Sequence, residues 1–74
     1  DGKRVQVFPN PFYSRILLTD GTGSETFELV NTMGRVIWTG SHVEEQDFSG
    51  LGKGVYFLKV TTGRLVQTVK VVKE

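Results

Sequence analysis

The sequence predicts an all-β domain, built as an open two-layer sandwich of seven antiparallel strands. Short runs rich in valine, aromatic and β-branched residues recur along the chain, and turns that contain glycine separate them. Apolar and polar residues alternate within these runs, and no segment shows a sustained apolar stripe of helical period. We therefore expect no helix longer than one turn, and we expect residues 1–74 to form a single domain.

The predicted strands cover residues 3–8, 14–19, 25–31, 35–39, 43–48, 54–61 and 64–73. The turns between them are expected at residues 20–23, 31–34, 39–41, 49–54 and 61–63. Glycine suits these turns because it adopts the positive φ values that tight turns require. Short strands at such close spacing are typical of a sandwich or a barrel. An odd number of strands favours the open sandwich.

The first and third predicted strands alternate as a half-buried sheet does. Val5 and Val7 alternate with polar neighbours in the first strand, and Phe27 and Leu29 flank Glu28 in the third. The second strand contains the apolar run "ILL". Each of the three therefore has an apolar side that can face a common core.

The later strands divide into central and edge positions. The segments "RVIW" and "GVYFLKV" carry apolar residues on both faces, so we expect both in the centre of a sheet, with Trp38, Tyr56 and Leu58 largely buried. The run "VEEQDF" at 43–48 is mostly polar and is expected at an edge, where its charges discourage edge-to-edge association. The final run, 64–73, ends in "VKVVK" and is also expected at an edge.

A stiff elbow is predicted where Pro9 and Pro11 enclose Asn10. They are the two prolines of the chain, and each removes a backbone donor and fixes φ, so strand pairing must stop there. Each proline also pushes the residue before it toward extended geometry. The elbow follows the first strand directly, so it marks a point where the chain changes direction.

The overall composition gives no field that would attract nucleic acid or an anionic membrane. Nine basic residues stand against eight acidic ones, for a net charge of +1. The chain has no cysteine, which excludes disulfides, a thiolate nucleophile and a cysteine metal site. Its apolar runs fall far short of the roughly 20 residues that span a bilayer. We therefore expect no nucleic-acid partner and no direct membrane span.

The single histidine, His42, lies close to three carboxylates, which suggests a metal or acid–base cluster. On the predicted strand, alternation would place His42 and Glu44 on one face and Glu45 and Asp47 on the other. The ligands would then not converge. The sequence therefore predicts a solvated edge here and no metal site.

The remaining motifs do not predict catalysis or a cofactor. The loop "GLGKG" at 50–54 lacks the spacing of a phosphate-binding loop and precedes a strand, so we expect a turn. Ser41 is the one serine beside a histidine, and on a strand the two side chains would point to opposite sides. A solvated strand face is expected for the basic residues Lys59, Arg64, Lys70 and Lys73. We predict that the domain is not an enzyme.

Four motifs in a fixed order identify a family resemblance. They are "VFPNPF" at 7–12, "FELVNTMGRVI" at 27–37, "LGKGVYFLKV" at 51–60 and "TVKVVKE" at 68–74. In this order they resemble the C-terminal sorting domain of the type IX (Por) secretion system, over essentially the whole chain. The resemblance implies an immunoglobulin-like β-sandwich. Each motif alone is weak, whereas four in order with these separations are specific.

The matching positions are Pro9, Asn10, Pro11, Gly34, Arg35, Gly54, Val55, Tyr56, Lys70, Val71, Val72 and Lys73. The chain departs from the family pattern at two places. Asn31 stands where the family usually has aspartate, which preserves the side-chain acceptor of an Asx turn, and Gly52 stands where the family usually has proline. Neither departure falls on a matching position. The resemblance implies that the matching positions serve structure, recognition or both.

The resemblance implies that this domain is the tail of a larger exported protein. Its partners would be the outer-membrane translocon and the shuttle proteins of the type IX system, and a surface sortase-like peptidase would usually remove it. The protein would be periplasmic in transit and then at the cell surface or secreted. The alternative is an accessory β-sandwich domain that binds carbohydrate or protein, for which Phe12 and Tyr13 are the exposed aromatic candidates.

Two features could serve recognition of such a domain, the elbow and the last strand. For the elbow there are two hypotheses: it marks the end of a linker and holds that linker accessible, or it only switches the chain between sheets. In the last strand, Val69 and Val71 share one face and Lys70 and Val72 the other, so the strand can anchor in the core and present a basic outer side that includes Lys73. At a sheet edge, this strand would offer its free backbone groups to a partner strand.

Overall fold

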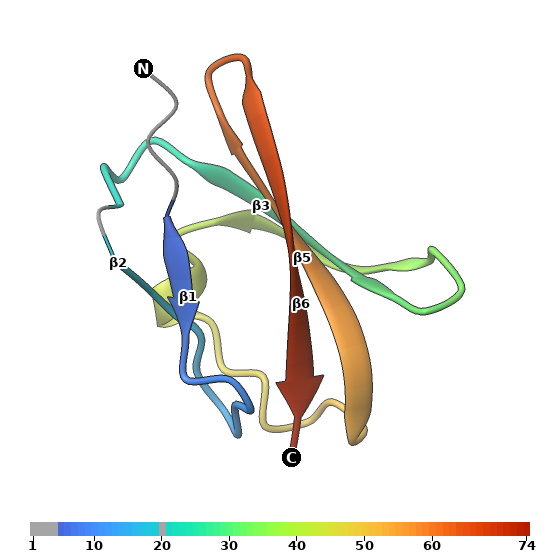
Figure 1. Cartoon of the computed structure of the whole chain (residues 1–74). Helices are drawn as coiled ribbons and strands as arrows, with labels where there is room; N and C mark the ends of the chain where they lie inside the picture. The colour runs from blue at the N-terminus through green and yellow to red at the C-terminus, as the bar shows by residue number, and fades with distance from the viewer. Residues whose placement is uncertain (1–4, 20) are drawn as a thin grey trace.

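The computed structural model of the chain describes residues 5–19 and 21–74 (Figure 1). They form six strands and one turn of 3₁₀ helix, in the order β1 Gln6–Phe8, β2 Leu17–Thr19, β3 Thr26–Asn31, β4 Val36–Ser41, η1 Val43–Glu45, β5 Gly54–Thr62 and β6 Leu65–Lys73. The prediction of an all-β domain with no long helix is confirmed for these residues. Residues 3 and 4 of the first predicted strand and residue 20 of the first predicted turn lie outside them.

The strands form two antiparallel sheets. Strands β1 and β2 pair with each other, and the larger sheet has the order β4-β3-β5-β6. The two-stranded sheet lies against the larger sheet, and its side chains Val7 and Leu18 pack on the hydrophobic core (Figure 1). The immunoglobulin-like sandwich type stays a prediction, because the smaller sheet has two short strands among the described residues.

The prediction of a strand at 43–48 is wrong, and the described chain has six strands rather than seven. Val43 and Phe48 are 0% and 3% exposed, and both belong to the core. They are separated by an odd number of positions, so a strand would point them to opposite faces. The segment instead turns through η1, after His42 takes a left-handed conformation with φ of 53°. This turn lets both apolar side chains point inward.

The core is centred on the inner face of the larger sheet. The register pairs Phe27 with Val60 and Leu29 with Leu58, so four buried side chains of β3 and β5 lie side by side. Val71 of β6 joins the same hydrophobic cluster. The opposite side of the core comes from the connecting segments and the smaller sheet, chiefly Phe12, Ile16, Val43 and Phe48.

The central position of the segment 54–60 is confirmed, because β5 pairs with β3 on one side and β6 on the other. The predicted central position of "RVIW" is wrong. Strand β4 lies at an edge, where Val36 is 48% and Ile37 40% exposed. With no strand formed at 43–48, no described strand covers the outer side of β4.

The three side chains expected in the core differ in their burial. Leu58 is fully buried, whereas Trp38 and Tyr56 are half-buried. The Tyr56 hydroxyl donates a hydrogen bond to the Gly52 carbonyl at 2.8 Å, which keeps the polar end of the ring at the surface. The Trp38 ring packs edge-on against Phe48, with 5.4 Å between centroids. Edge position and polar contacts therefore limit the burial of both aromatic residues.

The turn predicted at 39–41 is part of β4 instead. Gly40 and Ser41 pair with Phe27 and Thr26 of β3. A Cβ atom on Gly40 would lie 3.0 Å from the Trp38 ring. Glycine is therefore required here for the close approach of an indole ring rather than for a turn.

Candidate functional site

The elbow attaches the N-terminal part of the chain to β6. The Asn10 side chain donates a hydrogen bond from Nδ2 to the Lys70 carbonyl at 2.9 Å, and its Oδ1 accepts one from the Val72 N–H at 3.0 Å. Pro9 and Pro11 flank it at the surface, and the peptide bond before each is cis. The elbow thus carries the chain from the smaller sheet to the edge of the larger one.

Phe12 continues this attachment through its backbone. Its N–H donates to the Val72 carbonyl at 2.8 Å, and its own carbonyl accepts from the Glu74 N–H at 2.9 Å. The Phe12 ring is fully buried and packs edge-on against Phe48. Tyr13, by contrast, is 66% exposed. The two aromatic residues therefore form no common platform, and the carbohydrate-binding alternative loses its candidate site.

The motif segments of β5 and β6 lie opposite each other. The register pairs Gly54 with Lys73, Val55 with Val72 and Tyr56 with Val71. Gly54 has φ of +142°, a conformation that residues with a side chain rarely adopt. The pairing of β5 with β6 thus brings the third and fourth motifs to the same end of one sheet.

The two faces of β6 differ from the predicted pattern at one residue. Val71 is fully buried, Lys70 is exposed and Val72 is half-buried, as the alternation predicts. Lys73 shares the inward side with Val71 and is 7% exposed, and its Nζ donates to the Glu74 carbonyl at 2.8 Å. The inclusion of Lys73 in an outward basic side is therefore wrong. Its parity follows Val71, so strand alternation turns it inward.

Gly34 and Arg35 lie at the tip of the β3–β4 hairpin. The Asn31 side chain accepts hydrogen bonds from the N–H groups of Met33 and Arg35, both at 2.9 Å, and Gly34 has φ of +82°. The Asx-type role expected for Asn31 is thus observed. This hairpin projects away from the end of β6 that carries the elbow (Figure 1). Gly34 and Arg35 therefore lie apart from the matching positions of the other three motifs, although β3 of the same motif pairs with β5.

Three side chains around η1 come together, contrary to the argument from strand alternation. Ligand atoms of His42, Glu44 and Glu45 lie within 4.8 Å of one another, and His42 Nδ1 is 3.6 Å from Glu44 Oε2. All three residues are exposed. Asp47 stands outside this group and accepts a hydrogen bond from the Ser49 N–H, which lowers the pKa of the Asp47 carboxyl. The turn brings the ligands together, while their exposure leaves them solvated.

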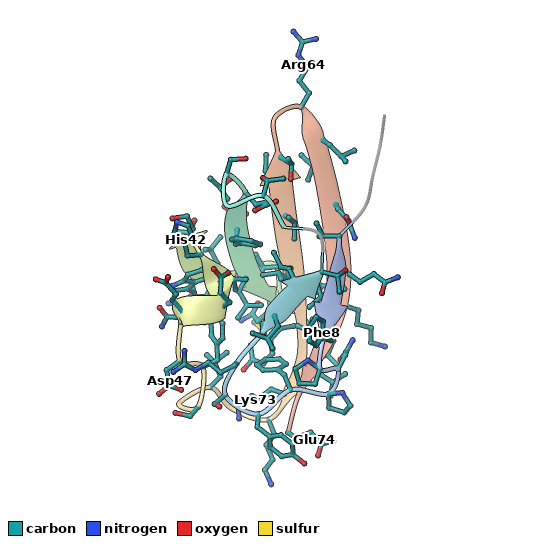
Figure 2. The ribbon with its side chains drawn as sticks, turned by 90° about the vertical axis from the view of Figure 1, so that its left-hand side faces the viewer. Phe8, His42, Asp47, Arg64, Lys73 and Glu74 are labelled. Atoms are coloured by element: carbon teal, nitrogen blue, oxygen red, sulfur yellow. The ribbon has the colours of Figure 1, made fainter. Side chains whose placement is uncertain are left out.

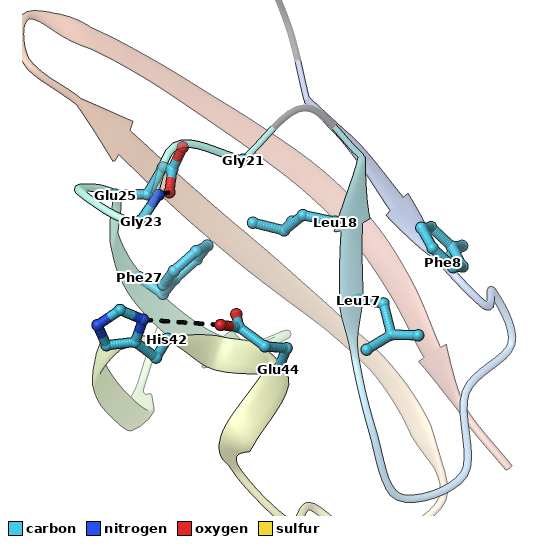
Figure 3. Close-up of a pocket in the computed structure, with 9 residues that line it drawn as sticks. All are labelled: Phe8, Leu17, Leu18, Gly21, Gly23, Glu25, Phe27, His42 and Glu44. Carbon is cyan, nitrogen blue, oxygen red and sulfur yellow. Dashed lines mark hydrogen bonds and ion pairs between the residues drawn. The ribbon is translucent and has the colours of Figure 1, made fainter.

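A hollow of about 320 Å³ opens between β2 and β3, with His42 and Glu44 at its mouth (Figure 3). The Glu25 carboxylate on its wall already accepts hydrogen bonds from the N–H groups of Thr22 at 2.7 Å and Gly23 at 3.0 Å. The Thr22 N–H is the main reason that the pKa of Glu25 is lowered. Because this carboxylate is committed to its own turn, it is not free to hold a ligand in the hollow.

The basic residues do not form one surface in the part of the chain that is described. Arg64 lies at one end of the molecule and Lys73 at the other (Figure 2). Lys59 pairs with Glu28 at 3.8 Å on the exposed face of the sheet. Among the described residues, no helix is both long enough and apolar enough to cross a membrane.

The role of Asn10 as a cap on β6 was not predicted from the sequence. Its partners lie about sixty residues away along the chain, beyond the reach of local patterns. One signal was present: an amide side chain between two residues that lack a backbone donor can replace the missing N–H. The burial of Phe12, three positions from the first proline, was also missed.

Comparison with known proteins gives one family. Residues 6–74 match the secretion system C-terminal sorting domain. No curated protein and no solved structure matches the chain. The match covers every described strand, including the elbow and the end of β6 that it caps. The chain therefore belongs to the family of C-terminal sorting domains of the type IX secretion system.

Proposed function

We propose that this domain is the signal by which the outer-membrane translocon of the type IX system recognises a cargo protein and passes it to the cell surface. The family match over residues 6–74 carries this proposal. The clustering of three motif segments at one end of the fold supports it, because a recognition surface needs its residues close together. The domain acts as an address and performs no chemistry.

We place recognition at the elbow and the end of β6, with Pro9, Asn10, Lys70 and Val72 at the surface. Lys70 supplies a charge that orients a partner, and Val72 supplies apolar area beside it. Shuttle proteins of the same system receive the domain after export. A surface sortase-like peptidase then removes it at the linker that precedes the domain. The parent protein thus passes through the periplasm and ends at the cell surface or outside the cell.

A reporter fusion tests the recognition surface. The reporter is fused before residue 1 and expressed, behind a signal peptide, in a bacterium that has a type IX system. The double variant Lys70→Gln/Val72→Thr should keep the melting temperature within a few degrees, because both side chains lie outside the core, while most of the reporter stays in the periplasm. The measurement is the surface fraction of the reporter together with its size, which reports removal of the domain.

The matched control is Lys59→Gln/Val36→Thr, which changes the same residue types on β5 and β4, away from the elbow and from β6. This control should reach the surface as the unchanged domain does. Normal display of the Lys70/Val72 variant would remove this end of β6 from the recognition surface. Equal display of a reporter without the domain would overturn the sorting function itself.

A further inference from the structure

The outward edge of β6 has two parts that differ in their hydrogen bonding. Backbone groups of alternate residues in a strand point to the same side. The bonds from Asn10 and Phe12 show that Lys70 and Val72 point theirs away from β5. Val66 and Thr68 therefore point the same way. Within the described residues, no hydrogen bond reaches their backbone groups on that side. Among residues 5–19 and 21–74, therefore, the half of the edge at Lys70 and Val72 is capped and the half at Val66 and Thr68 is not, while the Gln67 side chain between them bonds to the Val5 backbone.

The cap copies the chemistry of an added strand. Phe12 pairs in parallel with the end of β6 through its backbone. Two positions earlier, the Asn10 side chain supplies one donor and one acceptor, which are the two groups that a peptide unit offers. It takes this role because the prolines beside it have no N–H. The end of β6 thus already binds one extended segment, residues 10–12, through backbone-like hydrogen bonds.

We call residues 9–12 the arm. Its two contacts with β6, through Asn10 and through Phe12, differ in how firmly they are held. Phe12 is fully buried in the core, so it anchors the arm. Asn10 is exposed, and water replaces its two hydrogen bonds when it moves away. Local opening is expected where exposed hydrogen bonds and few apolar contacts hold a segment. Asn10 can therefore leave the edge while Phe12 stays in place.

We propose that the edge of β6 from Val66 to Val72 is a strand-addition site that Asn10 keeps closed, and that its partner is an extended polypeptide segment that replaces Asn10. With the arm closed, a partner strand reaches the free groups of two residues. With Asn10 withdrawn and Phe12 still bonded to the Val72 carbonyl, it also reaches the Lys70 carbonyl and the Val72 N–H, over a length typical of a strand. Lys70 is exposed and in no ion pair among the described residues, so the segment carries a carboxylate opposite it.

This inference deepens the proposed function, since it assigns the docking edge of the sorting signal, but the exchange at the edge is tested without secretion. Amide hydrogen exchange is measured on the purified chain and on Asn10→Ala. The Val72 amide should exchange at least about tenfold faster in the variant, because its acceptor is lost. The Glu74 amide, which bonds to Phe12, should keep its rate. The control Tyr13→Phe leaves Asn10 untouched and removes only the hydroxyl that bonds to the Glu74 carboxylate at 3.4 Å, so it should leave the Val72 rate unchanged.

A peptide probe then tests strand addition. The probe is a synthetic peptide with the sequence of residues 25–31, "ETFELVN", which forms a strand in this fold and carries two carboxylates. It should slow exchange at Thr68, Lys70 and Val72 in Asn10→Ala, and bind the unchanged chain at least about tenfold more weakly, because Asn10 competes for the edge. A peptide with glutamine at both glutamate positions should bind the variant more weakly than the probe.

Several results would overturn the proposal. These are an unchanged Val72 rate in Asn10→Ala, equal binding of the probe to both chains, or protection that appears on β4 instead. The Leu58 amide reports global opening, so a general loss of stability in the variant is recognised by faster exchange there. If the probe binds at the edge but a reporter without the domain reaches the surface equally well, the docking edge is supported and the sorting function is rejected. If the domain sorts the reporter but the probe does not bind, the sorting function is supported and the docking edge is rejected.

Discussion

At the scale of single residues, two polar side chains fix two turns through backbone N–H groups. The Glu25 carboxylate accepts from Thr22 and Gly23, including the Thr22 hydroxyl at 3.1 Å. The side-chain oxygen of Asn31, Oδ1, accepts from the N–H groups of Met33 and Arg35 in the β3–β4 turn. The role of Asn31 is readable from its place before a glycine turn. The role of Glu25 was missed, because alternation places it at the start of a strand and gives no sign of bonds to the preceding turn.

The Glu25 turn should make stability depend on pH. Hydrogen bonds lower the folded-state pKa of Glu25 below its ordinary value of 4.5. This contribution is therefore complete above the unfolded-state pKa, and it is lost as the pH falls through the lowered folded value. Glu25→Gln should cost roughly 1 kcal/mol at pH 7, and the gap to the unchanged chain should shrink toward pH 3. Urea unfolding at both pH values measures this gap.

The exposed Glu45→Gln variant is the control for that experiment, and it should follow the unchanged chain at both pH values. A gap for Glu25→Gln that stays constant between pH 7 and pH 3 would show that the carboxylate charge adds nothing to the turn.

Asn31 permits a sharper comparison between two substitutions. Asn31→Ala removes the acceptor of two backbone N–H groups and should lower the free energy of unfolding by about 1 kcal/mol. Asn31→Asp keeps an oxygen at the same place and should change it by less than about 0.5 kcal/mol. Denaturant unfolding of both variants decides the matter. Equal losses would mean that the turn does not depend on this acceptor.

At the scale of elements, the segment Val43–Phe48 shows where the sequence pattern misleads. Four polar residues in a row suggest an edge strand, yet the two apolar ends determine the conformation, since both are buried in the core. Spacing was the available signal, because an odd separation is incompatible with one buried face of a strand. Strands such as β5, with apolar residues over their whole length, were placed correctly because burial there agrees with the pattern.

Phe48 should be one of the most sensitive positions in the fold. Its ring packs edge-on against Phe12 at 6.2 Å and Trp38 at 5.4 Å, and so joins the arm, η1 and β4. Phe48→Ala should cost about 3–5 kcal/mol, enough to unfold much of a domain of this size. Glu44→Ala, exposed in the same segment, should cost within about 0.5 kcal/mol. Thermal unfolding followed by circular dichroism compares them, and similar melting temperatures would contradict the burial of Phe48.

At the scale of the whole molecule, the larger sheet has two edges that are protected differently. The arm covers part of β6, whereas β4 has no charged residue between Val36 and Ser41 and exposes Ile37. Bare edges of this kind promote association between molecules. The sequence predicted that β6 lies at an edge. The sequence also predicted β4 in the centre of a sheet. That prediction failed because an apolar strand has the same residue pattern whether or not a second strand pairs with its outer edge.

A charge on the bare edge should reduce association. Ile37→Lys should lower light scattering at high protein concentration, while unfolding free energy changes by no more than about 0.5 kcal/mol, because this side chain is already 40% exposed. Met33→Lys adds the same charge on the hairpin tip, where Met33 is 87% exposed, and serves as the control. If both variants scatter less to the same degree, net charge rather than the β4 edge governs association.

The contact between the arm and β6 also has a consequence for the order of folding. Asn10 and its partners are separated by 60 and 62 positions, so the arm waits during synthesis until β6 has been made. Contacts of such long range form late, because the intervening chain must first be ordered. A chain that stops short of β6 leaves Phe12 without its pairing strand and exposes an aromatic ring to chaperones and proteases. The closed arm thus distinguishes a chain that includes β6 from one that stops before it.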